Sequence, residues 1–131
     1  MDYRYLGRSA IKVSPLCLGA MMFGGETSEQ DAKRIIDKAY DQGIDFIDTA
    51  DVYHGGRSEE TTWPALKNLG PKRDEVVVAS KAFGLVGECL HASGSPRLLI
   101  LGVVQPTLKL PQLPHLDLYP LPVSHLFPSV Y

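Results

Sequence analysis

The first 13 residues alternate apolar and polar side chains with the period of two that is typical of β-strands. Tyr3 and Tyr5 lie on one face of this pattern, and the alternation resumes at Ile11 and Val13. A polar turn that starts at Gly7 separates the two runs. The pattern therefore predicts a small β-hairpin at the start of the chain.

Residues 27–43 change to a helical period. Apolar side chains recur there at i, i+3, i+4, i+7 and i+8, namely Ala32, Ile35, Ile36, Ala39 and Tyr40. Thr27 or Ser28 is a suitable N-cap, and Gly43 is a suitable C-terminal stop. We expect a helix that packs its apolar stripe on a sheet and turns its charged face to water.

Short apolar runs predict strands over residues 15–23, 43–50 and 74–83, and the consecutive valines of the last run suit a parallel strand covered on both faces. A second helix is predicted over residues 58–70, with Ser58 as its N-cap. Pro64 should kink or shorten that helix. The alternation of strands and helices predicts right-handed βαβ units and a parallel sheet, either open or closed into a (β/α) barrel.

The chain changes character near residue 84. The segment 85–131 holds seven of the ten prolines but only 4 charged residues, against 24 in residues 1–84. We therefore divide the chain into an α/β part, 1–84, and an irregular Pro/Leu-rich C-terminal tail, 85–131. The P-x-x-P at residues 111–114 is compatible with an SH3 ligand, and the tail equally fits a truncated, alternatively spliced or frame-shifted end.

Composition excludes several classes of protein. With a net charge of -2, a pI near 6.0 and no run of Lys or Arg, we expect no nucleic-acid partner. The longest apolar run is too short to span a bilayer and no signal peptide is evident, so we expect no membrane partner and a cytoplasmic location. Cys17 and Cys89 lack any metal-binding or redox spacing and are expected to be reduced thiols.

Three polar side chains follow the predicted strands at their carboxyl ends, where parallel α/β folds gather their active sites. Asp48 and Lys81 close adjacent strands, so they can pair, and Tyr53 lies five residues beyond Asp48. A phenol is a poor acid at neutral pH because its ordinary pKa is about 10, but an adjacent ammonium lowers that value. The set can therefore protonate a carbonyl oxygen that receives a hydride from a nicotinamide.

Other interpretations of these residues stay open. Asp48 and Lys81 could form a purely structural ion pair. A metal site from Asp48, Asp51, His54 and Glu59 lacks a known ligand rhythm, so no metal is predicted. No GxGxxG or Walker pattern follows a strand, which argues against a Rossmann or P-loop nucleotide site.

The segments "YRYLGRSAIKVSPLCLGAMMFGG", "GIDFIDTADVYHGGRSEE" and "RDEVVVASK" resemble the N-terminal third of an aldo/keto reductase of the potassium-channel β-subunit-like branch. The resemblance covers residues 1–83 and implies part of a (β/α)8 TIM barrel that uses NADPH. It implies that Tyr53 is the proton donor, Lys81 its activating neighbour and Asp48 the anchor of Lys81. The residues implied at the cofactor are Gly19, Ala20, Met21 and Asp48, and those implied at the substrate are Met22 and His54.

The sequence also departs from this family. A complete barrel needs about 250 residues, twice the length of this chain. The family's fourth catalytic residue, a histidine that ends the fourth strand, falls at Pro122 in "DLYPLP", with His125 out of step. Most family contacts to the phosphates and adenine of NADPH come from the last strands, which this chain lacks.

Two functions follow from the sequence. The first is NADPH-dependent reduction of a small aldehyde or ketone to an alcohol, and whether this chain itself is an active enzyme is left open. The second is a non-catalytic barrel fragment that forms a homo-oligomer, or associates with a full-length relative, through an open sheet edge.

Overall fold

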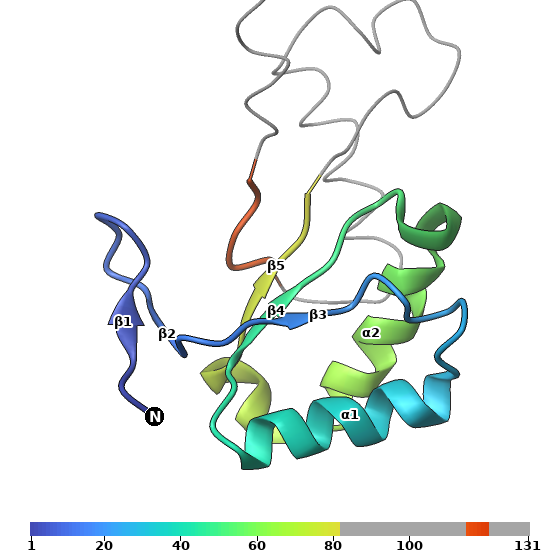
Figure 1. Cartoon of the computed structure of the whole chain (residues 1–131), viewed down its shortest axis with the longest axis horizontal. Coiled ribbons are helices and arrows are strands. Elements are labelled where there is room, and N and C mark those ends of the chain that lie inside the picture. Colours follow the sequence, from blue (N-terminus) through green and yellow to red (C-terminus); the bar gives the residue numbers. More distant parts are fainter. Residues whose placement is uncertain (82–114, 121–131) are drawn as a thin grey trace, which may run out of the picture.

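The computed structural model describes residues 1–81 and 115–120 of the chain. A three-stranded parallel sheet carries two helices on one side, and a separate two-stranded hairpin precedes it (Figure 1). The predicted α/β organisation is confirmed for these residues, whose strands do not close into a barrel. The division at residue 84 stays a prediction, and the P-x-x-P, Cys89, Pro122 and His125 lie outside the described residues.

The predicted hairpin is present. Strands β1 (Arg4–Tyr5) and β2 (Lys12–Val13) pair antiparallel, with Arg4 opposite Val13. The Tyr3 hydroxyl donates a hydrogen bond to the Gly43 carbonyl at 3.0 Å. This bond fastens the hairpin to the turn that follows the first helix.

The parallel sheet has the order β3-β4-β5, which follows the chain. Its strands are β3 (Leu18–Gly19), β4 (Phe46–Asp48) and β5 (Val77–Ala79). Gly19 lies opposite Asp48, and Asp48 lies opposite Ala79. The carboxyl ends of the three strands are therefore level, and the connections that follow them leave from the same edge of the sheet.

Helix α1 (Glu29–Asp41) is close to the prediction. The Ser28 hydroxyl caps it by accepting a hydrogen bond from the Asp31 N–H at 3.1 Å. Gly43, at φ 82°, lets the chain leave the helix in a left-handed conformation that other residues disfavour. The predicted apolar stripe is buried at Ala32, Ile36 and Ala39, whereas Ile35 is 39% exposed at the helix flank.

Helix α2 (Arg57–Lys67) begins one residue earlier than predicted, and Ser58 is not its N-cap. Gly56 caps the helix at φ 95°, and Ser58 is buried inside the first turn. The helix continues past Pro64 to Lys67 as one element. Proline deprives only the Glu60 carbonyl of its helical partner, and Glu60 lies on the exposed side, where water is available.

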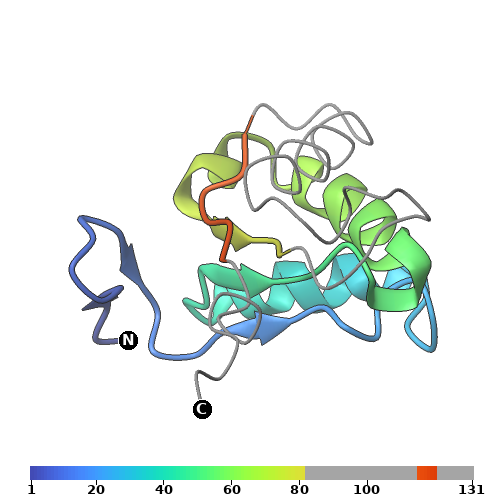
Figure 2. The ribbon, with the colours of Figure 1, turned by 90° about the horizontal axis from the view of Figure 1, so that it is seen from above.

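A hydrophobic cluster among the described residues joins the two helices to the sheet. The ribbon in Figure 2 shows α1 and α2 beside the strands. Trp63 and Leu66 of α2, Ile36 of α1, and Ile47 and Val78 of the sheet are almost fully buried within this cluster. Burial of each such side chain stabilises the fold by about 1.5–3 kcal/mol. This cluster fixes the helices against the strands and so fixes the carboxyl ends of the strands. No helix in the described part of the chain is long and apolar enough to cross a membrane.

Residues 115–120 lie beside β5, in the position of a further parallel strand (Figure 1, orange-red segment). Leu118 forms a parallel bridge with Ala79, donates to the Val78 carbonyl at 3.1 Å and accepts from the Ser80 N–H at 3.1 Å. Residues 115–120 hold one isolated bridge and no regular strand, so they extend the sheet at Leu118 alone. The backbone N–H and C=O groups along the edge of β5 need hydrogen-bond partners, and this segment supplies some of them. The Pro/Leu-rich composition of the segment did not predict this pairing.

An ion pair fastens this segment to the sheet. Arg73 lies 3.1 Å from Asp117 Oδ2, and its side chain is only 8% exposed. The same guanidinium donates to the Val76 carbonyl at 2.7 Å, and Asp117 Oδ2 also accepts from the Val78 N–H at 2.9 Å. One carboxylate thus pairs with a buried cation and accepts a hydrogen bond from a strand amide.

We predict that Asp117→Ala lowers the free energy of unfolding by about 2–4 kcal/mol, because it leaves Arg73 buried without its partner. Urea unfolding followed by the fluorescence of Trp63, the single tryptophan, measures the loss. Arg34→Ala is the matched control, since it breaks the exposed pair with Asp31 and should change the stability little, because water screens exposed pairs. Equal losses in the two variants would contradict the account.

Candidate active site at the carboxyl ends of β4 and β5

Asp48 and Lys81 form an ion pair at the carboxyl edge of the sheet. Asp48 is the last residue of β4, and Lys81 follows β5 by two residues. Lys81 Nζ donates to Asp48 Oδ2 at 2.6 Å and to the Thr49 carbonyl at 3.2 Å. The predicted pairing of these two side chains is confirmed, with the lysine and the aspartate 23% and 35% exposed.

Tyr53 completes the set that the sequence singled out. It opens a short 3-10 turn, Tyr53–Gly56, between β4 and α2. Lys81 Nζ stands 4.8 Å from the centre of the Tyr53 ring. The ammonium therefore lies against both the Asp48 carboxylate and the Tyr53 ring, so the structure brings all three predicted catalytic residues together.

Two opposing effects set the pKa of Lys81. Burial disfavours the charged ammonium and lowers the pKa, but the hydrogen bond to Asp48, the interaction with Tyr53 and the negative charge of Asp48 outweigh it. The pKa of Lys81 is consequently raised above its ordinary value. Lys81 is thus a permanent cation at neutral pH, as an activating neighbour of a phenol must be.

The end of β3 borders this set on the other side of β4. Gly19 is exposed, and a Cβ added to it would meet no atom within 4 Å, so the space above the strand end is open. Met21 is exposed and Met22 half-buried. Ala20 is fully buried in the hydrophobic cluster, so its side chain does not face that space. Its N–H instead donates to the Asp48 carbonyl at 2.8 Å.

A buried polar chain behind the site was not predicted. The Ser58 hydroxyl donates to the Ala20 carbonyl at 2.6 Å and lies 2.8 Å from the Thr49 hydroxyl, which is therefore the donor between the two. The Ser80 hydroxyl donates to the carboxylate of Glu59, which is only 1% exposed. These bonds tie the first turn of α2 to the ends of β3, β4 and β5.

Of the possible functional roles, only that of a metal ligand was weighed for Glu59 from the sequence, because an acid in the first turn of a helix is usually solvated and favoured there by the helix dipole. The available signal was its position next to Ser58 and three residues after Gly56, where a tight turn brings the start of the helix onto the sheet. Tyr119 lies within electrostatic reach of Asp51 and Glu59: burial raises the pKa of its phenol, and the charges of the two carboxylates add to the increase. Sequence reasoning did not assign Tyr119 to the site.

Cys17 lies within the electrostatic reach of the ion pair. Burial raises the pKa of its thiol to about 11, the charge of Asp48 adds to the increase, and the charge of Lys81 opposes it. Cys17 is a free thiol just before β3, packed closely enough to be partly desolvated but still open to solvent on one side. Within residues 1–81 and 115–120, no group of three His, Cys, Asp or Glu side chains is arranged to hold a metal ion.

Comparison with known proteins agrees with this geometry. The sequence profile described as "Aldo/keto reductase family" matches residues 15–119, most of the chain. The chain belongs to the aldo/keto reductase family. The match confirms the family predicted from the sequence and extends through the paired segment 115–119.

The chain is also similar to individual curated proteins. The chain is 37% identical over 127 residues to the "Uncharacterized oxidoreductase YrpG" of Bacillus subtilis, covering 91% of this chain and 39% of that protein. It is 42% identical over 84 residues to a "Probable voltage-gated potassium channel subunit beta" of rice, Oryza sativa subsp. japonica, covering 63% and 26% of the two chains.

A solved family member has the same fold over this region. The aldo-keto reductase AKR11C1 from Bacillus halodurans, in its holo form, superposes with a TM-score of 0.74 at 34% identity. The match covers 92% of this chain and 40% of that chain. This chain therefore spans about two fifths of the length of AKR11C1 and of YrpG.

Cys17 provides a reporter of the ion pair that needs no activity. We predict that Asp48→Asn lowers the pKa of the Cys17 thiol and Lys81→Met raises it, because each removes one of the two charges acting on it. The pH dependence of iodoacetamide alkylation, read by peptide mass, measures the pKa. Asp37→Asn, which removes a half-buried carboxylate of α1 that is not among the charges acting on Cys17, is the control and should leave it unchanged. An alkylation profile that neither Asp48→Asn nor Lys81→Met moves would refute the arrangement.

Proposed function

We propose that this chain is an aldo/keto reductase oxidoreductase that reduces a small aldehyde or ketone to an alcohol with NADPH. The observation that carries the proposal is the position of Lys81, whose ammonium contacts Asp48 and the Tyr53 ring at the carboxyl edge of the sheet. A cytoplasmic location, inferred from composition, stays part of the proposal.

Each of the three residues has a distinct role. Tyr53 gives its phenolic proton to the carbonyl oxygen of the substrate. The Lys81 ammonium stabilises the phenolate that this transfer leaves behind, since the two groups are in contact. Asp48 holds the ammonium in place through the 2.6 Å hydrogen bond and keeps it charged. The same three side chains would thus donate the proton and stabilise the negative charge left on the Tyr53 oxygen.

The described residues fit the nicotinamide end of the cofactor. The open space above Gly19, the exposed Met21 and the partly exposed Asp48 leave room for a flat ring beside Lys81. NADPH would supply the hydride to the carbonyl carbon. Ala20 would contribute its backbone only, because its side chain is buried. Met22 and His54 would border the substrate on the side of the β3 and β4 loops.

We predict that Tyr53→Phe lowers the rate of NADPH oxidation with a reactive aldehyde by about 10²-fold or more, because the proton donor is lost while the ring remains. Absorbance loss of NADPH measures the rate. Tyr5→Phe is the matched control: Lys12 lies 4.9 Å from the Tyr5 ring, a similar lysine contact away from Asp48. This control should retain the wild-type rate. A wild-type rate equal to that of Tyr53→Phe would refute the catalytic proposal.

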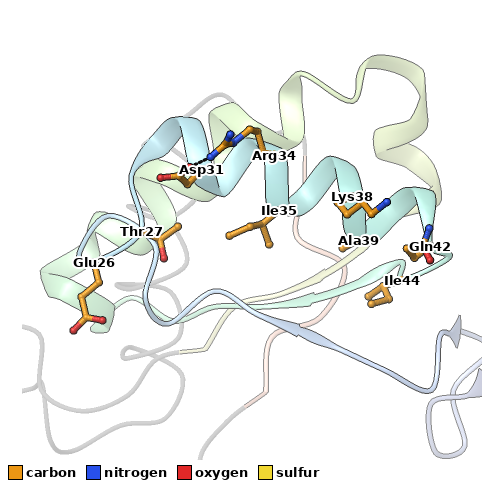
Figure 3. A pocket seen from close by; sticks show the side chains of 9 residues that line it. All are labelled: Glu26, Thr27, Asp31, Arg34, Ile35, Lys38, Ala39, Gln42 and Ile44. Carbon is orange, nitrogen blue, oxygen red and sulfur yellow. Dashed lines mark hydrogen bonds and ion pairs between the residues drawn. The ribbon is translucent and has the colours of Figure 1, made fainter.

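The sheet edge favours self-association as a second candidate function. Among the described residues, β3 pairs with β4 alone, so its other edge offers free backbone groups. An open groove beside α1 presents Ile35, which is 39% exposed, and Ile44, within a rim that includes Asp31, Arg34 and Lys38 (Figure 3). A second copy of the chain presents the same edge and the same apolar side chains.

Light scattering after size exclusion tests the association. We expect a dimer or larger species for the wild type and a smaller one for Ile35→Lys, which places a charge in the groove. Val52→Lys is the matched control, because Val52 is 38% exposed but lies outside the groove. A compact wild-type monomer would exclude this function and leave the catalytic proposal untouched.

A further inference from the structure

Glu59 is an acidic residue that helix α2 holds inside the fold. Its side chain is only 1% exposed, although acids are rarely buried to this extent. Its carboxylate accepts a hydrogen bond from the hydroxyl of Ser80, which is itself completely buried. Neither side chain can turn out to solvent unless the helix separates from the sheet, so the contact between them is fixed from both sides.

Ser80 joins strand β5 to Lys81. The Ser80 N–H donates to the Leu118 carbonyl at 3.1 Å, so the hydrogen bonding of the strand continues through this residue. Successive side chains of an extended chain point to opposite faces. Because the Ser80 hydroxyl points to α2, Lys81 points away from the helix, where its ammonium meets Asp48 at 2.6 Å. The direction of the Ser80 side chain thus sets the direction of Lys81.

Two adjacent residues of α2 hold the two strands that carry the ion pair. The Ser58 hydroxyl lies 2.8 Å from the Thr49 hydroxyl, so it fastens the first turn of the helix to the end of β4. Glu59 fastens the same turn to the residue that follows β5. Asp48 and Lys81 emerge from these two strand ends, so the helical turn sets the distance between them.

We propose that Glu59 is a positioning residue for Lys81: by holding the Ser80 hydroxyl against α2, its carboxylate keeps the Lys81 ammonium on Asp48 and beside the Tyr53 ring. Glu59 acts through Ser80 and does not contact the ammonium. The role needs an oxygen acceptor at residue 59, since the group that it holds is a hydroxyl donor. The effect of this placement on catalysis rests on the proposed function, whereas the placement itself does not.

Cys17 reports the placement of the ammonium without any need for activity. Burial raises the pKa of its thiol, the charge of Asp48 adds to the increase and the charge of Lys81 opposes it, whereas Glu59 is not among the charges acting on it. Substitution of Glu59 therefore reaches the thiol through the ion pair. The midpoint of the pH profile of iodoacetamide alkylation measures the pKa, because accessibility changes the rate of alkylation but not the midpoint.

Glu59→Leu removes the acceptor, so Lys81 should lose its place and the Cys17 midpoint should rise toward that of Lys81→Met. The rise should lower the thiolate fraction at pH 9 by about twofold or more. Ser80→Ala should shift the midpoint in the same direction. The double variant Glu59→Leu/Ser80→Ala should shift it no further than the larger single shift, because both substitutions break one hydrogen bond. Glu59→Gln keeps an oxygen acceptor and should retain the wild-type midpoint.

Thr62→Val is the matched control. Thr62 is buried in α2 like Glu59, but its hydroxyl donates to the Ser58 carbonyl of the same helix at 2.6 Å and not to a strand end. Loss of this hydrogen bond should lower the Tm by about 4–8 °C and leave the Cys17 midpoint unchanged. A shift of the midpoint in Thr62→Val as large as in Glu59→Leu would overturn the proposal.

An unchanged midpoint in Glu59→Leu or in Ser80→Ala would overturn it as well, and so would a shift in Glu59→Gln equal to that in Glu59→Leu. If Glu59→Leu does not fold, Ser80→Ala decides in its place, because it removes a single oxygen atom from the same hydrogen bond. A raised midpoint in Ser80→Ala then supports the proposal, and an unchanged one overturns it.

The catalytic consequence is measured separately, with NADPH and a reactive aldehyde. Ser80→Ala should lower kcat about tenfold and leave KM for the aldehyde nearly unchanged, because a displaced Lys81 no longer stabilises the phenolate formed in the reaction. Glu59→Gln should retain the wild-type kcat. An unchanged kcat in Ser80→Ala would overturn the catalytic part of the proposal. Absence of turnover in the wild type would refute the proposed function alone, while the Cys17 midpoints would still decide whether Glu59 positions Lys81.

Discussion

The parallel register of β4 and β5 is the constraint on which the rest of the structure depends. Asp48 lies opposite Ala79, so Lys81 emerges beside the Asp48 carboxylate and the two side chains meet at 2.6 Å. A slip of one residue would turn one of them to the other face of the sheet and separate the charges. The hydrophobic cluster beneath the sheet specifies this register, because Ile47 and Val78 must both face the helices.

The same register also places the buried hydroxyl groups of Thr49 and Ser80 against helix α2. Thr49 and Ser80 directly follow β4 and β5, and both are completely buried against the first turn of α2. Buried polar groups are costly unless they are hydrogen-bonded. Ser58 and Glu59 supply those hydrogen bonds, so the strand ends and the helix hold one another. The hydrogen bonds of Ser58 and Glu59 to the strand ends therefore help to keep Asp48 and Lys81 side by side.

The sequence predicted those parts of the fold that local patterns determine. Helix α1, the hairpin and the alternation of strands and helices rest on periodicity and capping, which neighbouring residues decide. Asp48, Tyr53 and Lys81 could be found because strand ends are visible in the pattern. The cap of α2 was missed because Gly56 in a left-handed conformation replaced Ser58. Glu59 was missed because only tertiary contacts bury it. The bridge at Leu118 was indicated by the resemblance of "DLYPLP" to the family's fourth strand and not by any local pattern.

The most direct test of the account follows the hydride itself. Wild-type chain is incubated with an aromatic aldehyde and NADPH that carries deuterium at both C4 positions, and the alcohol is analysed by mass spectrometry. We expect the wild type to give an alcohol with one deuterium on its carbinol carbon, and we expect the Lys81→Met variant to give a much lower yield of this alcohol. An alcohol yield no greater than in the protein-free control, or equal yields from both proteins, would contradict the central claim.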